Sequence, residues 1–209
     1  MRIFCFGDSN TYGYDARSLL GERLGENERW PEILGKLSGW EVVNEGMNGR
    51  EIPESPWFLD RFDHLLSACA PVDALFLMLG SNDLLNSYRP DMENIGRRME
   101  KFVKHVLEHP AVDGRGEIVV LAAPPPVEIG CCGEEYVCYD RESHKFGTCY
   151  EAIAKQYGLR FANTADWELP LAHDGVHLSP EGHARFADQM WTLMQKFIVH
   201  KLNDKLQIL

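Results

Sequence analysis

The chain has 209 residues, of which 44% are hydrophobic, 11% aromatic and 25% charged, as is ordinary for a globular protein. This composition excludes collagen, low-complexity disorder and a disulfide-dense miniprotein, and the length fits a single domain over residues 1–209. Acidic residues outnumber basic ones by 32 to 21, so the formal net charge is −11. Because this charge would repel phosphate backbones and anionic lipid surfaces, we expect no nucleic-acid and no membrane partner.

The termini and the cysteines favour a cytoplasmic, reduced setting. No apolar run approaches the ~20 residues of a membrane span, and the N-terminal apolar run passes at once into polar loop residues, unlike a secretory signal. Cys5 lies in a strand-like run and Cys69 on an apolar helix face, where free thiols behave as small hydrophobes. The cluster of Cys131, Cys132 and Cys138 lacks the paired spacing of a zinc site, so we interpret it as a loop with free thiols.

Five short apolar runs are predicted as strands, and two of them are apolar almost throughout, as expected of strands buried on both faces. They cover residues 2–6, 41–44, 74–79, 118–123 and 159–162. Because helical patterns separate these runs, the chain is predicted to form an α/β fold with a parallel sheet and helices on both faces.

Four stretches with apolar residues at a spacing near 3.6 are predicted as amphipathic helices. The first begins at Ser55 and Pro56, a capping residue followed by a proline suited to the first turn, and Pro71 stops it; the last begins at Ser179 and Pro180. Their apolar residues fall within 58–69, 92–106, 146–157 and 186–198.

Two segments fit neither pattern. Residues 127–142 follow the end of a strand and are long for a plain connection, so we interpret them as a candidate lid or pocket wall. Residues 201–209 are expected either to fray or to dock on a partner.

In an open parallel sheet, ligands bind at the carboxyl ends of the strands, so the loops that follow the strands are where chemistry is expected. Ser9 comes directly after the first strand, in a tight turn into a helix whose N-terminus would favour a developing oxyanion. The alternative interpretation is that Ser9 simply caps this helix. Asp174 precedes His177 by three residues, so its carboxylate can orient the imidazole while the other ring nitrogen takes the serine proton.

Two further loops supply donors for a tetrahedral intermediate, whose negative oxygen needs two or three of them. Asn82 could offer its side-chain amide, Gly49 a backbone N–H, and Ser9 its own N–H. Taken singly, Asn82 is as well explained as a turn residue and Gly49 as a position of positive φ. The prediction of a joint site depends on all these loops ending at one edge of the sheet.

These residues together resemble the blocks of the SGNH (GDSL-like) hydrolase superfamily. Gly7-Asp8-Ser9 matches the nucleophile block, Gly49 the oxyanion glycine, Gly80-Ser81-Asn82-Asp83 the block with the oxyanion asparagine, and Asp174-Gly175-Val176-His177 the acid and base. The strings CFGDSNTYGY, ERWP and VVNEGMNGR look most like those of small bacterial arylesterase and acyltransferase-like members. Asn10 departs from the usual leucine; because that position is not catalytic, the departure puts substrate preference in question rather than activity.

The resemblance implies a three-layer α/β/α flavodoxin-like fold with about five parallel strands. It also implies no metal or other cofactor, and hydrolysis of small-molecule esters or thioesters, with acyl transfer to alcohols in some members. The acyl chain, the alcohol and the balance of hydrolysis and transfer stay open. Aromatic residues in loops weakly favour a homo-oligomer, which the sequence also leaves open.

Two other hypotheses fit parts of the sequence. A non-catalytic flavodoxin-like module could bind a flavin or nucleotide through the loop after the first strand, although this loop lacks the P-loop lysine and the GxGxxG spacing. A metal hydrolase would use His173, Asp174, His177 and His183, although Gly175 and Pro180 argue against the helix that this spacing needs. Four aromatic residues were interpreted either as pocket walls or as core: Tyr12, Tyr14, Trp30 and Trp57.

Overall fold

The computed structural model describes the backbone of residues 1–206 and the side chains of residues 1–198. Its sheet has five parallel strands in the order β2-β1-β3-β4-β5, which is the flavodoxin-like order. The strands are β1 (Arg2–Gly7), β2 (Glu41–Gly46), β3 (Ala74–Met78), β4 (Val119–Ala123) and β5 (Arg160–Asn163). The predicted fold class is confirmed, and the five predicted runs differ from the strands by no more than two residues at either end.

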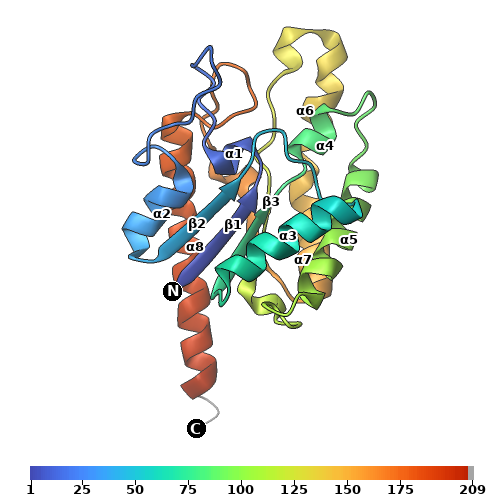
Figure 1. Cartoon of the computed structure of the whole chain (residues 1–209). Coiled ribbons are helices and arrows are strands. Elements are labelled where there is room, and N and C mark those ends of the chain that lie inside the picture. Colours follow the sequence, from blue (N-terminus) through green and yellow to red (C-terminus); the bar gives the residue numbers. More distant parts are fainter. Residues whose placement is uncertain (207–209) are drawn as a thin grey trace.

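Helices cover both faces of the sheet, which gives three layers (Figure 1). One face carries α2 (Trp30–Ser38) and α8 (Pro180–Leu206), and the other carries α3 (Pro56–Cys69), α5 (Met92–Glu108) and α7 (Phe146–Tyr157). Side chains of β1 alternate between the two resulting cores, with Ile3 and Cys5 in one and Phe4 and Phe6 in the other. This alternation explains why β1 is apolar along its whole length.

The four predicted helices correspond to α3, α5, α7 and α8, and the structure corrects one detail of their ends. Ser55 stands at the N-cap of α3, but its side chain makes no capping hydrogen bond. The helix expected after Ser9 is present as α1 (Ser9–Tyr12). Helix α2 was not predicted, although Trp30, Ile33, Leu34 and Leu37 have helical spacing. Other short helices carry too few apolar residues for a period to show; they are α4 (Ser81–Leu85), α6 (Val137–Ser143) and the 3-10 turns η1 (Gly116–Ile118), η2 (Gly130–Cys132), η3 (Glu134–Tyr136) and η4 (Thr164–Trp167).

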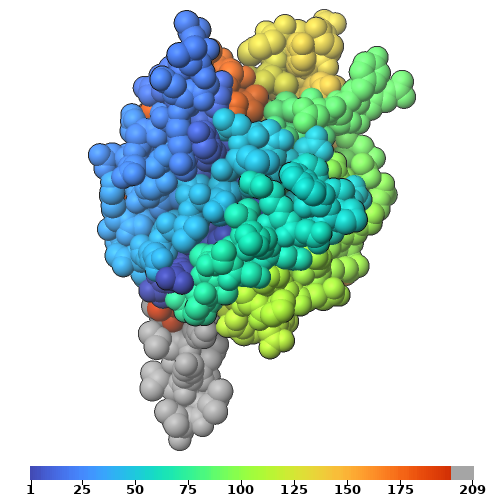
Figure 2. Space-filling model, in the orientation of Figure 1, coloured from blue at the N-terminus to red at the C-terminus, as the bar shows by residue number. Residues whose placement is uncertain are grey.

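The segment over 127–142 is not patternless, because it holds η2, η3 and most of α6. The Asp140 carboxylate links the two ends of this segment, because it accepts hydrogen bonds from the backbone N–H groups of Ile129 at 2.8 Å and Gly130 at 2.9 Å. This segment and the one after β1 project at the carboxyl end of the sheet, at the top of Figure 2. Whether it acts as a lid stays a prediction.

At the other end, α8 continues through Leu206, so residues 201–206 extend this helix, and residues 207–209 lie outside the described residues. That this end docks on a partner stays a prediction. Within residues 1–206, no helix combines the length and the apolar character needed to cross a membrane.

Candidate active site

Three of the predicted site residues, Ser9, Gly49 and Asn82, follow β1, β2 and β3 at their carboxyl ends, and Asp174 and His177 lie between β5 and α8. The chain order reverses at β1, which lies between β2 and β3, and such a reversal opens a crevice between the loops that leave the two sides. Ser9 is the first residue of α1 on one of these loops. Asp8, rather than Ser9, is the N-cap, because its carboxylate accepts a hydrogen bond from the Asn10 N–H at 2.9 Å. The interpretation of Ser9 as a helix cap is therefore wrong.

Ser9, His177 and Asp174 form one continuous chain of hydrogen bonds. The Ser9 Oγ lies 2.9 Å from His177 Nε2, and His177 Nδ1 lies 2.6 Å from Asp174 Oδ2. The carboxylate keeps the ring proton on Nδ1 and leaves Nε2 as the acceptor for the serine hydroxyl. Residues separated by 168 positions in the sequence thus meet in the geometry that general-base activation of a serine requires.

Hydrogen bonds hold the Asp174 side chain as a carboxylate. Burial alone would disfavour its charge, but the His177 ring and the backbone N–H groups of His177 and Val176, each 3.0 Å from Oδ1, donate to it. The net effect holds the pKa of Asp174 well below its usual range. Gly175 has a φ of +67°, and a Cβ there would lie 2.4 Å from the Glu128 carbonyl oxygen, so this tight turn requires glycine.

The loop after β2 is tied to the end of β1, close to Ser9. The Met47 N–H and the Arg50 Nη1 both donate to the Gly7 carbonyl, at 3.1 Å and 2.8 Å, and Arg50 also donates to the Glu45 carbonyl. The Arg50 guanidinium lies over the Phe6 ring, 4.0 Å from its centroid. Burial lowers the pKa of Arg50 to about 10, so this side chain is still charged at neutral pH.

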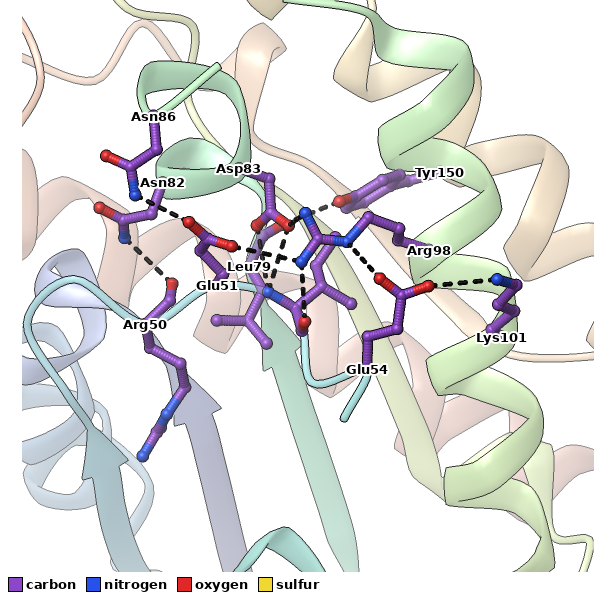
Figure 3. Close-up of polar contacts among 11 residues, drawn as sticks. Arg50, Glu51, Glu54, Leu79, Asn82, Asp83, Asn86, Arg98, Lys101 and Tyr150 are labelled. Carbon is purple, nitrogen blue, oxygen red and sulfur yellow. Dashed lines mark hydrogen bonds and ion pairs between the residues drawn. The ribbon is translucent and has the colours of Figure 1, made fainter. Parts of the chain in front are cut away.

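This loop also meets the loop after β3. The Asn82 Nδ2 donates to the Arg50 carbonyl at 3.0 Å, which leaves the second hydrogen of this amide for another acceptor (Figure 3). Gly49, two residues before Glu51, has a φ of +72° and no atom within 4 Å of the place that a Cβ would take, so its surroundings are open. The structure therefore brings Gly49 and Asn82 onto adjoining loops at the carboxyl edge that holds Ser9.

An ion pair between the buried Asp83 and the partly buried Arg98 lies beside these two loops (Figure 3). The Asp83 carboxylate lies 2.7 Å from Arg98 Nη1 and accepts a hydrogen bond from the Ile52 N–H at 3.1 Å. Arg98 in turn contacts Glu51 and Glu54, both at 3.3 Å. Burial raises the pKa of Asp83 to about 6, against the opposing effect of the Arg98 charge. The ion pair fixes the segment after Gly49 against α4 and α5.

The sequence analysis did not find Arg98. The one available signal is its place in α5, next to Met99 and within the apolar period of Ile95 and Phe102, where a charged residue indicates a buried partner. Nothing in the sequence indicates which partner that is, because Asp83 lies on a different helix, α4.

The structure does not support the metal-hydrolase hypothesis. Both ring nitrogens of His177 already face Asp174 and Ser9, and the Nδ1 of the buried His183 faces the Trp30 N–H at 3.4 Å. No group of three or more His, Cys, Asp or Glu side chains within the described part of the chain is placed to hold a metal ion. This finding includes the cluster of cysteines after β4.

The four aromatic residues that could be either pocket walls or core lie in different surroundings. The Tyr14 ring lies 4.5 Å from the His177 ring, beside the site. Tyr12 lies under the Arg23 guanidinium at 4.5 Å. Trp30 is 1% exposed and packs in the core, so the pocket-wall interpretation is wrong for it, whereas Trp57 is 64% exposed on α3.

Two cavities adjoin the site. The larger has a volume of about 610 Å³ and meets the site at Gly49. Its lining combines apolar side chains, among them Phe6, Ile52, Phe58 and Phe62, with the charged side chains of Arg50, Glu51, Glu54, Arg61 and Arg98. The smaller, of about 210 Å³, is lined by Tyr14 and by Leu178, the residue after His177. The first cavity thus reaches the site through Gly49, and the second reaches it through Tyr14, whose ring contacts His177.

A five-stranded parallel sheet of this order, with a serine, a histidine and an aspartate in contact at its carboxyl edge, is the arrangement of an SGNH-type hydrolase. A model of the GDSL-like lipase/acylhydrolase family matches residues 5–185, and the chain belongs to this family of ester hydrolases. An Arabidopsis thaliana protein named a GDSL esterase/lipase is 26% identical over 175 residues, which cover 72% of this chain and 70% of that protein.

Solved structures agree on the fold. Est24, a carbohydrate acetylesterase from Sinorhizobium meliloti, is 23% identical with a TM-score of 0.78, and the match covers 93% of this chain and 98% of that one. The native aryl esterase of M. smegmatis is 22% identical with a TM-score of 0.79, over 94% of this chain and 99% of that one. At these identities the two structures establish likeness of fold alone.

Proposed function

We propose that this esterase works through an acyl-enzyme on Ser9. His177 takes the proton from the Ser9 hydroxyl as Oγ attacks the acyl carbon, and Asp174 stabilises the imidazolium that forms. The N–H groups of Ser9 and Gly49 and the Asn82 amide hold the negative oxygen of the tetrahedral intermediate. His177 then gives its proton to the leaving alcohol, and water releases the acid from the acyl-enzyme.

The observation that carries this proposal is the 2.9 Å contact between Ser9 Oγ and His177 Nε2. A histidine whose Nδ1 is bonded to a carboxylate has one remaining base, at Nε2, and here that base faces a hydroxyl at the carboxyl edge of the sheet. A purely structural serine–histidine pair would need neither the carboxylate nor the open surroundings of Gly49. Membership of a hydrolase family also favours an enzyme over a flavin-binding or nucleotide-binding module.

For the substrate, we propose small esters with a short acyl group, on an aryl or carbohydrate alcohol. The cavity at Gly49 and the smaller cavity at Tyr14 give space near the site for the two parts of an ester. The names of the Sinorhizobium meliloti and M. smegmatis structures, a carbohydrate acetylesterase and an aryl esterase, support these two alcohol classes. Thioester cleavage and acyl transfer to a second alcohol use the same acyl-enzyme and belong to the proposal.

The test compares the wild type, Ser9→Ala and Ser38→Ala on p-nitrophenyl esters of increasing acyl length and on acetylated sugars. Ser38 is a matched control, because its hydroxyl donates to the Leu34 carbonyl within α2, away from the site. We expect turnover and covalent labelling by a fluorophosphonate in the wild type and in Ser38→Ala, and neither in Ser9→Ala. Equal turnover by Ser9→Ala and the wild type would refute the nucleophile. Adding an alcohol tests acyl transfer, with the new ester as its product.

A further inference from the structure

The residue after the proposed nucleophile is bonded to the loop that carries the proposed base. The Asn10 side chain donates from Nδ2 to the Val176 carbonyl at 3.2 Å, and its Oδ1 accepts from the Leu178 N–H at 2.8 Å. Val176 and Leu178 are the two neighbours of His177. Only one orientation of the amide satisfies both contacts, because the carbonyl needs a donor and the N–H an acceptor.

This arrangement copies the pairing between neighbouring strands. A side-chain amide offers the same donor and acceptor as a peptide group, and here it bonds the peptide on each side of His177. Asn10 is itself 3% exposed and lies in α1, which starts at Ser9. The amide therefore joins the turn that carries Ser9 to the turn that carries His177, and each residue of the bridge is the direct chain neighbour of a reacting residue.

Other contacts hold the His177 loop internally, but they do not aim it at Ser9. Asp174 bonds the His177 ring and backbone, and the Ala172 N–H donates to the His177 carbonyl at 2.6 Å. These partners all belong to the loop itself and would move with it. The Glu128 N–H donates to the Gly175 carbonyl at 2.7 Å, which anchors the far side of the turn to the segment after β4. Besides the Ser9–His177 contact itself and the Tyr14 ring beside His177, the Asn10 amide ties the loop to the helix of the nucleophile.

We propose that Asn10 is a positioning residue that sets the distance between Ser9 Oγ and His177 Nε2. The inference rests on the proposed function of these two residues. It assigns a role to the departure from leucine at this position, and that role concerns turnover rather than substrate preference. A leucine has neither the donor nor the acceptor, so it would leave the Val176 carbonyl and the Leu178 N–H without this partner.

The experiment measures kcat and KM separately for the wild type, Asn10→Leu and Asn10→Asp, with Thr164→Val as the matched control. The Thr164 hydroxyl is also buried and donates to the Ala123 carbonyl at 2.7 Å, and valine keeps its shape while removing the hydrogen bond. We expect Asn10→Leu to lose about 10²-fold in kcat, the order of loss caused by a misplacement of about 1 Å, with KM little changed. Thr164→Val should lose thermal stability and keep its kcat.

Asn10→Asp has the shape of the wild-type side chain, so it tests the proposal even where Asn10→Leu fails to fold. It keeps the acceptor for Leu178 and, as a carboxylate, loses the donor to Val176, so its kcat should fall between those of the wild type and Asn10→Leu. The rate of inactivation by a fluorophosphonate should fall in parallel with kcat in both variants, because this reagent also needs His177 to activate Ser9.

Proton NMR separates positioning from a general loss of structure. The hydrogen bond between His177 Nδ1 and Asp174 lies within the loop, so its downfield proton should persist in both Asn10 variants while kcat falls. The proposal is overturned if that proton disappears together with activity, or if both variants keep the wild-type kcat. An inactive wild type, or a Ser9→Ala variant as active as the wild type, would instead overturn the proposed function.

Discussion

His183 should make the stability of this protein sensitive to mild acid. Its ring is fully buried at the start of α8, and Nδ1 faces the Trp30 N–H as an acceptor, so a proton added there would point at another donor. Burial, together with the charges of His177 and Arg29, lowers the pKa of His183 to about 3, from the ordinary 6.5. Between these two values the unfolded chain binds a proton that the folded chain does not, so stability falls as the pH falls from 6.5.

The size of the effect follows from these two pKa values. Between pH 7 and pH 5 the contribution of His183 changes by about 2 kcal/mol, which is one and a half pH units at about 1.4 kcal/mol each. In His183→Asn the amide oxygen can take the place of Nδ1 and no group titrates. The variant is less stable at both pH values because a smaller side chain fills the site, but it should lose about 2 kcal/mol less than the wild type between them.

The assay is urea unfolding of both proteins at pH 7 and pH 5. Burial raises the pKa values of Asp8 and Asp83 to about 6, and these carboxyl groups act in the opposite direction. Because both proteins contain them, their contribution cancels when the pH-dependent change of one protein is subtracted from that of the other. His144→Asn, which replaces an exposed histidine, should follow the wild type. If the free energy of unfolding falls by the same amount in the wild type and in His183→Asn between pH 7 and pH 5, within about 0.5 kcal/mol, then burial does not keep His183 neutral in the folded protein.

Three further substitutions test the site. Asp174→Asn should keep the fold and lose about 10⁴-fold in kcat, because the ring loses its orienting carboxylate; steady-state kinetics and a thermal melt measure the two. Asn82→Ala should lose roughly 10²- to 10³-fold in kcat with KM little changed, as expected of an oxyanion donor, and an unchanged kcat would remove it from that role. Gly46→Ala should lower the free energy of unfolding by about 1–3 kcal/mol and slow fluorophosphonate labelling of Ser9, because a Cβ there would lie 2.1 Å from the Tyr12 backbone nitrogen and would displace α1. Labelling at the wild-type rate would show that the substitution does not displace α1.

The strands could be predicted because each is a short apolar run with a physical reason to be buried. β3 and β4 are buried at every position, so their runs are continuous and easily recognised. α6 could not be predicted in the same way, because it lies at the surface and only Ser143 of its residues is buried. Without a buried face, a helix has no apolar period to detect.

The residues proposed for chemistry were found because each stands at a strand end or in a tight turn. Ser9 follows β1 directly, and the three-residue spacing of Asp174 and His177 is short enough for a turn to bring them together. The position of Ser9 after a strand and the contact between Asp174 and His177 both depend on a few consecutive residues, so the sequence alone can indicate them. The roles of these residues stay predictions until the kinetics are measured.

The amino-acid order was enough to indicate the fold class, the edge of the sheet where chemistry belongs and the side chains able to perform it, because burial periods and turn spacing act over a few residues. Only the packed chain shows that the Asn10 side chain bonds both neighbours of His177, and that Arg98 pairs with Asp83 beside the candidate oxyanion loops. It also decides that the Trp30 side chain lies in the core. These contacts join residues far apart in the chain. Which residues meet in these contacts depends on how the helices and strands pack against one another, and a pattern over a few consecutive residues does not contain that information.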